Sequence, residues 1–208
     1  RLEESSGGIN FNSGAAYVFV RSGTSWSQQA KLTASDAAEL DAFGMGASID
    51  GDYVIVGAPD NDDDGTSSGS AYIFVRSGTS WSQQAKLTAS DAAASDNFGD
   101  GVSISGEYAI ISAHADDDDG TNSGSAYTFK RSGTSWSQET KLTASDAAER
   151  DYFGRSDLSG ENSIIAALGD GGVNEIGSAY IFYNDLTAPT ISSVSLASDN
   201  STIAVTMS

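Results

Sequence analysis

The sequence predicts an all-β protein made of tandem four-stranded propeller blades, about three of them in an incomplete ring or open array, with a C-terminal β-hairpin. Three observations lead to this fold class. A unit of 55 residues recurs along the chain, the apolar runs are short and separated by turn residues, and 23 glycines stand against 2 prolines. Internal repetition of short strands and Gly-rich turns is typical of propellers and related repeat architectures.

Aromatic residues mark the repeat. Three tryptophans are 55 residues apart, and three Phe-Gly pairs keep the same spacing. A segment that begins Arg-Ser-Gly-Thr-Ser-Trp-Ser-Gln returns in each unit. The markers are Trp26, Trp81 and Trp136, with Phe43-Gly44, Phe98-Gly99 and Phe153-Gly154.

Each unit is predicted to contain four short strands. In the middle unit these are 45–49, 53–58, 71–75 and 81–88. The second and third strands are nearly continuous apolar runs, as expected when both faces of a sheet are covered. The first strand has small residues and suits a crowded position near an axis. The fourth strand, with Gln83, Gln84 and Lys86, suits a solvated outer edge.

The motifs that punctuate these strands carry a family resemblance. Phe43-Gly44, Gly57-Ala58-Pro59 and the segment Gly69-Ser70-Ala71-Tyr72-Ile73-Phe74 resemble the FG-GAP repeat over about residues 1–185. The family forms the seven-bladed propeller of integrin alpha-subunit heads and occurs in bacterial surface and secreted proteins, to whose branch this chain is most similar. The resemblance implies a non-catalytic binding or adhesion module, extracellular or at the cell surface, with a protein or glycan ligand.

The pattern changes after residue 185. Residues 1–185 are expected to form the blades and 186–190 a linker. Residues 191–208 alternate apolar and polar positions around Ser198-Asp199-Asn200-Ser201, which predicts a hairpin. This segment resembles the start of a bacterial immunoglobulin-like module, and it is alternatively an exchanged hairpin that needs a neighbour to cover it.

The number of strands bears on assembly. About thirteen strands before residue 185 make little more than three blades, whereas closed propellers usually have four to eight. Three explanations stay open: the missing blades belong to a longer chain, other copies supply them, or the units stack as an open array. Open blade edges invite pairing with another chain, which would give self-association into an oligomer or filament. A structural subunit of an extracellular filament or sheath is the alternative function. Basic residues at the end opposite the acidic loops would favour head-to-tail contact: Arg21, Arg76, Lys130 and Arg131.

Composition limits the classes of partner and of activity that are compatible with this chain. The formal net charge of −19 argues against nucleic acid and against anionic membrane surfaces, and it favours cations or a basic partner. No apolar run approaches the roughly 18 residues of a membrane span. With no cysteine and one histidine, the chain has no thiolate metal site and essentially no hydrolytic triad. We expect no enzyme activity.

Calcium is the predicted cofactor. The loop Asp60-Asn61-Asp62-Asp63-Asp64-Gly65 places carboxylates at alternate positions before a glycine, a pattern that suits a hard cation with oxygen ligands. Asp60, Asp62 and Asp64 are the first candidate ligands, and Asp117 and Asp119 repeat them one unit later. The loop lacks its own final ligands, so neighbouring loops at the same end are expected to supply more: Asp36, Asp41, Asp91 and Asp96. The alternative is a solvated acidic loop without a metal.

The repeated tryptophans leave two interpretations open. They could stack on sugars, which would make the chain a lectin, the third candidate function. More often, a tryptophan in such a hairpin packs against the neighbouring blade. The structural interpretation is therefore favoured.

Overall fold

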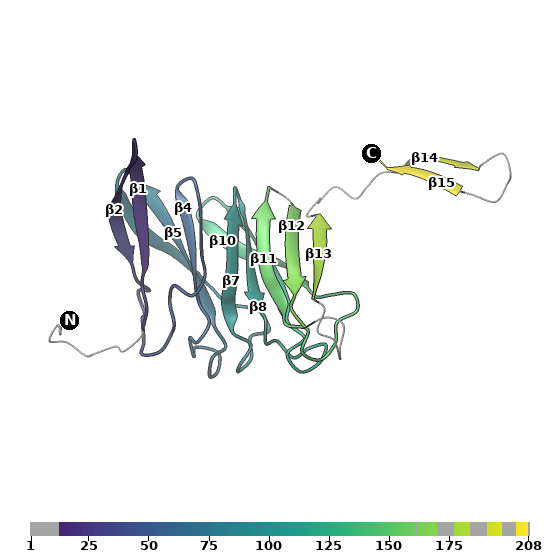
Figure 1. Cartoon of the computed structure of the whole chain (residues 1–208), viewed down its shortest axis with the longest axis horizontal. Coiled ribbons are helices and arrows are strands. Elements are labelled where there is room, and N and C mark those ends of the chain that lie inside the picture. The colour runs from purple at the N-terminus through teal and green to yellow at the C-terminus, as the bar shows by residue number, and fades with distance from the viewer. Residues whose placement is uncertain (1–12, 161, 170–176, 184–190, 197–202, 208) are drawn as a thin grey trace.

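The computed structural model describes residues 13–160, 162–169, 177–183, 191–196 and 203–207. Its strands form antiparallel sheets in which consecutive strands pair (Figure 1). The predicted linker, 186–190, lies outside the described residues. The all-β fold class of tandem, incompletely assembled blades with a C-terminal hairpin is confirmed, and the strand ends of the middle unit lie within two residues of those predicted.

The sheets follow the 55-residue repeat. The first blade has β1 (Ala16–Ser22) and β2 (Ser25–Leu32). The second has β3 (Ala47–Asp50), β4 (Tyr53–Ala58), β5 (Ser70–Ser77) and β6 (Ser80–Leu87). The third has β7 (Phe98–Ser105), β8 (Tyr108–Ala113), β9 (Ser125–Ser132) and β10 (Ser135–Leu142). The fourth has β11 (Phe153–Ser159), β12 (Asn162–Ala167) and β13 (Ser178–Tyr183), and β14 (Ile191–Leu196) pairs with β15 (Ile203–Met207) in a separate sheet.

Apolar side chains bury both faces of the middle strands. Along β4, Val54 and Val56 pack toward the first blade, whereas Ile55 packs toward the third. This alternation explains why β4 is apolar at consecutive positions, as predicted for a strand covered on both faces. Three such clusters join the four blades in chain order.

An aromatic residue seals each junction between blades. Phe98, at the start of β7, meets Tyr127 and Phe129 edge to face at centroid distances of 5.4 and 6.1 Å. Phe43 and Phe153 make the same contacts in their blades. The glycine after Phe98 has a φ of 100°, and a Cβ at Gly57 would overlap the carbonyl oxygen of Gly99. Gly57 therefore lets two backbones approach more closely than a side chain allows.

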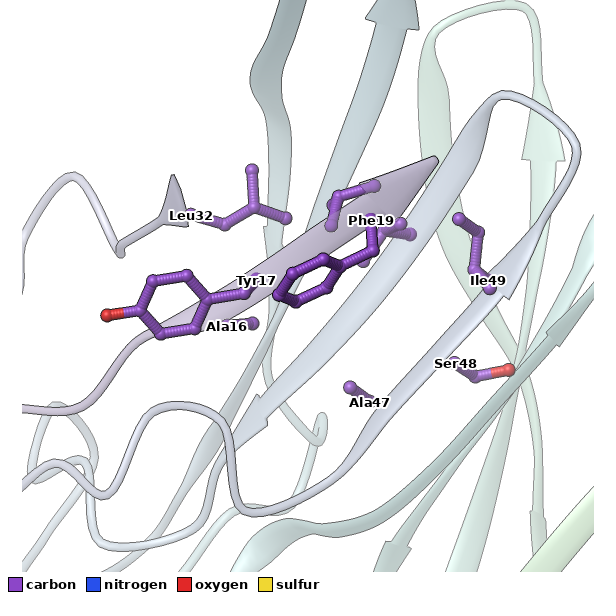
Figure 2. A pocket seen from close by; sticks show the side chains of 9 residues that line it. Ala16, Tyr17, Phe19, Leu32, Ala47, Ser48 and Ile49 are labelled. Atoms are coloured by element: carbon purple, nitrogen blue, oxygen red, sulfur yellow. The ribbon is translucent and has the colours of Figure 1, made fainter. Parts of the chain in front are cut away.

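The first blade is incomplete on its inner side within the described part of the chain. There it has β1 and β2, which correspond to the third and fourth strands of the complete blades. A groove runs between β1 and the strands β3 and β4, and its lining includes Tyr17, Phe19 and Ile49 (Figure 2). The groove occupies the place that the two inner strands of a complete blade would fill.

Candidate cation site

Both acidic loops lie against the loop that enters the next blade. Residues 59–69 connect β4 to β5, and the backbone amides of Ser95 and Asn97 donate to Thr66 and Ser67 of this loop at 2.8 and 3.0 Å. Residues 114–124 repeat the arrangement one blade later. The predicted meeting of the two kinds of loop at one end of the blades is therefore correct.

The three carboxylates predicted to form the first calcium site have separate roles. Asp60 Oδ1 accepts a hydrogen bond from Asn97 Nδ2 at 3.3 Å, and Asp62 Oδ1 accepts one from the Ser67 amide at 2.7 Å. Asp64 is exposed on the same loop. Among the described residues, these three carboxylates do not form a group with oxygens within 4.8 Å of one another.

Three of the other candidate ligands accept hydrogen bonds from backbone amides. Asp117 Oδ1 accepts the Asn122 amide at 2.6 Å, and Asp119 is exposed nearby. Asp41 and Asp96 are buried, and each accepts the amide three residues before it at 2.7 Å. These two carboxylates therefore close a turn in their own loops.

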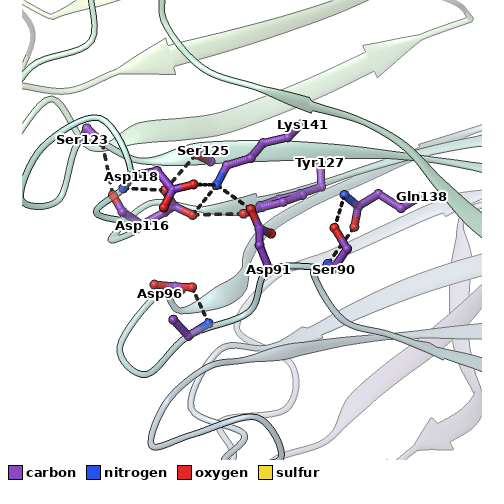
Figure 3. A network of polar contacts seen from close by, with 11 residues as sticks. Ser90, Asp91, Asp96, Asp116, Asp118, Ser123, Ser125, Tyr127, Gln138 and Lys141 are labelled. Atoms are coloured by element: carbon purple, nitrogen blue, oxygen red, sulfur yellow. Dashed lines mark hydrogen bonds and ion pairs between the residues drawn. The ribbon is translucent and has the colours of Figure 1, made fainter.

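Three other carboxylates do come together, at the junction of the second and third blades. Oxygen atoms of Asp91, Asp116 and Asp118 lie within 4.8 Å of one another. The Lys141 ammonium stands among them, with Nζ at 2.8 Å from Asp91, 2.9 Å from Asp116 and 2.5 Å from Asp118 (Figure 3). Asp91 comes from the entering loop, the other two from the acidic loop, and the lysine from β10. The geometry suits a cation, and in this fold a lysine side chain supplies it.

The preceding junction repeats this arrangement with one charge fewer. Lys86 of β6 pairs with Asp36 at 2.7 Å and also with Asp63. The position of buried Asp116 is taken here by buried Asn61, whose Oδ1 accepts from Ser70 Oγ at 2.9 Å. One ammonium therefore faces two carboxylates at this junction and three at the next.

Tyrosine rings complete the two lysine sites. Lys86 lies 5.3 Å from the ring centroid of Tyr72, and Lys141 lies 5.3 Å from that of Tyr127. The Tyr127 hydroxyl donates to Asp116 Oδ2 at 3.0 Å. The Tyr72 hydroxyl is buried and has no hydrogen-bond partner among the described residues, because an amide replaces that carboxylate. Cation–π attraction adds to the ion pairs in both places.

The ionisation of these groups reflects burial and pairing. Burial works to raise the pKa of Asp91, but the hydrogen bond from Lys141 and its positive charge outweigh burial, and the pKa lies below its usual value. Burial works to lower the pKa of Lys141, and its three carboxylate partners raise it instead. Burial raises the pKa of Tyr72 to about 12. Burial and the nearby Asp116 raise the pKa of Asp96.

The repeated tryptophans also act at the junctions. Trp81 Nε1 donates to Gln29 of the first blade at 2.8 Å, and Trp136 Nε1 donates to Gln84 of the second at 3.0 Å. Both indoles are partly buried. The structural interpretation of these two tryptophans is correct, whereas Trp26 in the first blade is exposed.

Sequence reasoning identified the acidic loops but missed the lysine. Lys31, Lys86 and Lys141 recur at the spacing of the tryptophans, five residues after each one. On a strand predicted to be solvated, these lysines suggested surface charge. Their repetition beside acidic loops was the signal that could have found them.

Stacked four-stranded antiparallel sheets joined by these repeated contacts define a protein of the β-propeller type, built from tandem blades. The FG-GAP repeat model matches residues 26–74, 81–129 and 136–182, and the chain belongs to the FG-GAP repeat family. Each match runs from the outer strand of one blade to the third strand of the next, so each covers one junction.

FG-GAP repeats typically form extracellular binding or adhesion modules and are generally non-catalytic. A comparison with curated proteins gives no match. Within the described residues, no helix is long and apolar enough to cross a membrane.

Proposed function

We propose that this chain is a non-catalytic extracellular binding or adhesion module that recognises a protein or glycan ligand at the cell surface. Membership of the FG-GAP repeat family supports this function. The observation that supports this function most directly is that the repeated residues make the contacts between neighbouring blades. The phenylalanines, two of the tryptophans, and Lys86 and Lys141 join one blade to the next, so the repeated chemistry builds a rigid scaffold. A scaffold of this kind presents its loops for recognition.

A binding assay tests the module directly. The chain is immobilised and exposed to panels of extracellular proteins and glycans, with the heat-unfolded chain as the control. Saturable binding that requires the folded chain is the expected result. Turnover of a panel component by the soluble chain would contradict the non-catalytic role.

We further propose that calcium strengthens the junction of the second and third blades. Asp91, Asp116 and Asp118 together carry three negative charges against the single charge of Lys141, so this junction retains negative charge. Oxygen ligands of this kind suit calcium, and extracellular modules bind it with dissociation constants of about 0.1–1 mM. The ion would share the carboxylates with the ammonium, and its affinity would therefore be low. The exposed carboxylates of Asp60, Asp62, Asp64, Asp117 and Asp119 add to the negative field at this end of the blades.

The matched variant for this idea is Asp116→Asn, which copies Asn61 of the neighbouring junction. The unfolding temperature of the unaltered chain should rise with millimolar calcium and fall back with EDTA. The variant should lose most of this response. An equal response in both proteins would contradict a site at this junction, and no response in either would contradict calcium binding altogether.

The second candidate function is that of a structural subunit in an extracellular filament or sheath. The observation that favours it is the incompleteness of the first and fourth blades, which leaves strand edges at both ends of the described array without a paired neighbour. Measuring the size of the chain in solution with and without EDTA separates the two functions. A calcium-dependent monomer supports the binding module, and calcium-independent long polymers support the filament.

A further inference from the structure

The third blade carries a titratable pair where the second blade carries an apolar one. Asp100 of β7 and His114, which follows β8, stand at the positions of Met45 and Pro59 one unit earlier. His114 is also the single histidine of the chain. The fourth blade repeats neither residue type at these positions. Both members of the pair therefore depart from the repeat together, and the departure is confined to one blade.

A β-bulge places the two side chains next to each other. Phe98 pairs with Ala113 and Val102 with Ile111, so three residues of β7 lie opposite one residue of β8. Asp100 is the middle one of the three. A bulge re-aims the side chain that it carries. The Asp100 carboxylate consequently lies beside the imidazole that follows the partner strand.

The separation of the two groups is too long for an ordinary hydrogen bond. His114 Nδ1 lies 3.4 Å from Asp100 Oδ2, whereas N–H···O bonds span about 2.7–3.2 Å. Nδ1 is buried, yet it has no hydrogen-bond partner in the part of the chain that the structure describes. A buried polar atom without a partner is destabilising. A group that binds both atoms at once would remove this cost.

The same separation suits two ligands of one metal ion. A tetrahedral ion holds an imidazole nitrogen and a carboxylate oxygen at about 2.0–2.2 Å, which places the two ligand atoms about 3.4 Å apart. An ion there would bind the Nδ1 lone pair of His114. It would also neutralise the carboxylate of Asp100, whose side chain is only 14% exposed. The ion would thus satisfy two polar groups that are largely out of water.

The fourth blade shields this position on one side. Tyr152, in the loop that enters that blade, has its ring 6.2 Å from the imidazole at an angle of 37°. The equivalent residue one unit earlier is Asn97, which instead donates to the Pro59 carbonyl at 3.3 Å. Tyr152 has a φ of 51°, a left-handed conformation that asparagine adopts more readily than tyrosine. Contact with His114 accounts for a bulky ring at this strained position.

We propose that Asp100 and His114 bind a divalent transition-metal ion of the Zn²⁺ or Cu²⁺ type. An imidazole nitrogen favours these ions, whereas calcium takes oxygen ligands. The site differs in residues and in ion from the acidic junction of the second and third blades. It therefore depends neither on the proposed calcium site nor on the identity of the extracellular ligand.

The two protein ligands leave the other coordination positions to water. The affinity is therefore expected to be lower than that of structural zinc sites, which have four protein ligands. The ion would join the ends of β7 and β8 at the bulge. Because it binds the folded chain, stability should rise with its concentration.

Zinc titration of the full, untagged chain tests the site. Asp100→Met and His114→Pro copy the second blade, so both variants should fold. Each should weaken zinc binding about tenfold or more in calorimetry, and each should reduce the rise in unfolding temperature. Asp64→Met removes an exposed carboxylate from a separate loop and is the control, which should bind zinc like the unaltered chain. Equal zinc affinity in all four proteins would overturn the proposal.

The single histidine allows a direct spectroscopic test. In a chain labelled at histidine nitrogen, Zn²⁺ should shift the Nδ1 resonance of His114, and Ca²⁺ should not. Cu²⁺ should show electron-spin coupling to one imidazole nitrogen, and Asp100→Met should weaken it. An imidazole that responds to pH but to neither metal ion would show an ordinary ion pair with Asp100, and the metal site would then be wrong.

Discussion

Lys141 Nζ lies 2.9 Å from Asp116 Oδ2, and this pair joins the outer strand of the third blade to its own buried acidic loop. The same ammonium reaches Asp91 of the second blade at 2.8 Å. At this junction, the lysine side chain therefore supplies the positive charge that the sequence analysis expected from a metal ion. Because the pair is largely buried, salt screens it less than a surface pair.

Removal of the lysine is expected to destabilise the two junctions unequally. Lys141→Met leaves the buried Asp116 carboxylate without a counter-charge and should lower the free energy of unfolding by about 3 kcal/mol. Lys86→Met removes a cation from two more exposed carboxylates, Asp36 and Asp63, and should cost only about 1 kcal/mol. Urea denaturation of both variants measures the difference. Equal losses would show that Asp116 is not what distinguishes the junctions.

Asn61→Asp should stabilise the chain. The new carboxylate would give the buried Tyr72 hydroxyl the acceptor that Tyr127 has in Asp116, and would add a third acid beside Lys86. A gain of about 1 kcal/mol in the free energy of unfolding is expected. The variant should also acquire a second calcium response of the size proposed for the Asp116 junction. Asn61→Leu, which fills the site without an acceptor, is the control and should destabilise.

The pKa shifts predict a plateau of stability with losses on both sides. The lowered pKa of Asp91 gives a contribution that is present above pH 3.8 and is lost as the pH falls through the folded-state value. The raised pKa of Lys141 gives one that is present below pH 10.5 and is lost as the pH rises through its folded-state value. The raised pKa of Asp96 partly offsets the loss of stability at acid pH, because a raised carboxyl pKa makes the folded state more stable as the pH falls.

Urea unfolding at intervals from pH 3 to pH 11 measures this profile. In Lys141→Met the alkaline loss should shrink, because the lysine whose raised pKa produces it is gone. An unchanged profile in this variant would contradict the assignment of the pH dependence to the junction.

Gly57→Ala should disrupt the junction of the second and third blades. The added Cβ would overlap the Gly99 carbonyl, which is backbone and cannot rotate away. The expected loss is about 3 kcal/mol or more. Ser112→Ala is the matched control, since Ser112 occupies the corresponding position and already has a Cβ. It loses the hydrogen bonds that Ser112 Oγ makes with the Gly154 carbonyl and with Ser156 Oγ, and its cost should be about 1 kcal/mol. Thermal or urea unfolding compares the two, and similar losses would contradict the close approach.

Much of the fold could be predicted from the sequence because its signals are local and repeated. The run Val54-Ile55-Val56 in β4 predicts a strand covered on both sides, and the turn residues between strands mark where each one ends. Repetition at 55 residues then sets the number and order of the blades. Backbone conformations were less accessible. Leu40 and Ala42 have φ values of 73° and 56°, which neither residue type favours and which the packed loop imposes.

The sequence by itself determined the repeated all-β blades and the acidic loops at one end of them. Only the tertiary structure decided which groups meet there. Asp60, Asp62 and Asp64 lie at alternate positions of one loop, yet Asp60 and Asp62 accept hydrogen bonds from different partners and the three carboxylates do not come together among the described residues. Asp91, Asp116 and Lys141 are distant in sequence and converge because the blades stack. The spacing of carboxylates describes a single segment of the chain, whereas packing brings together charged groups from three separate segments.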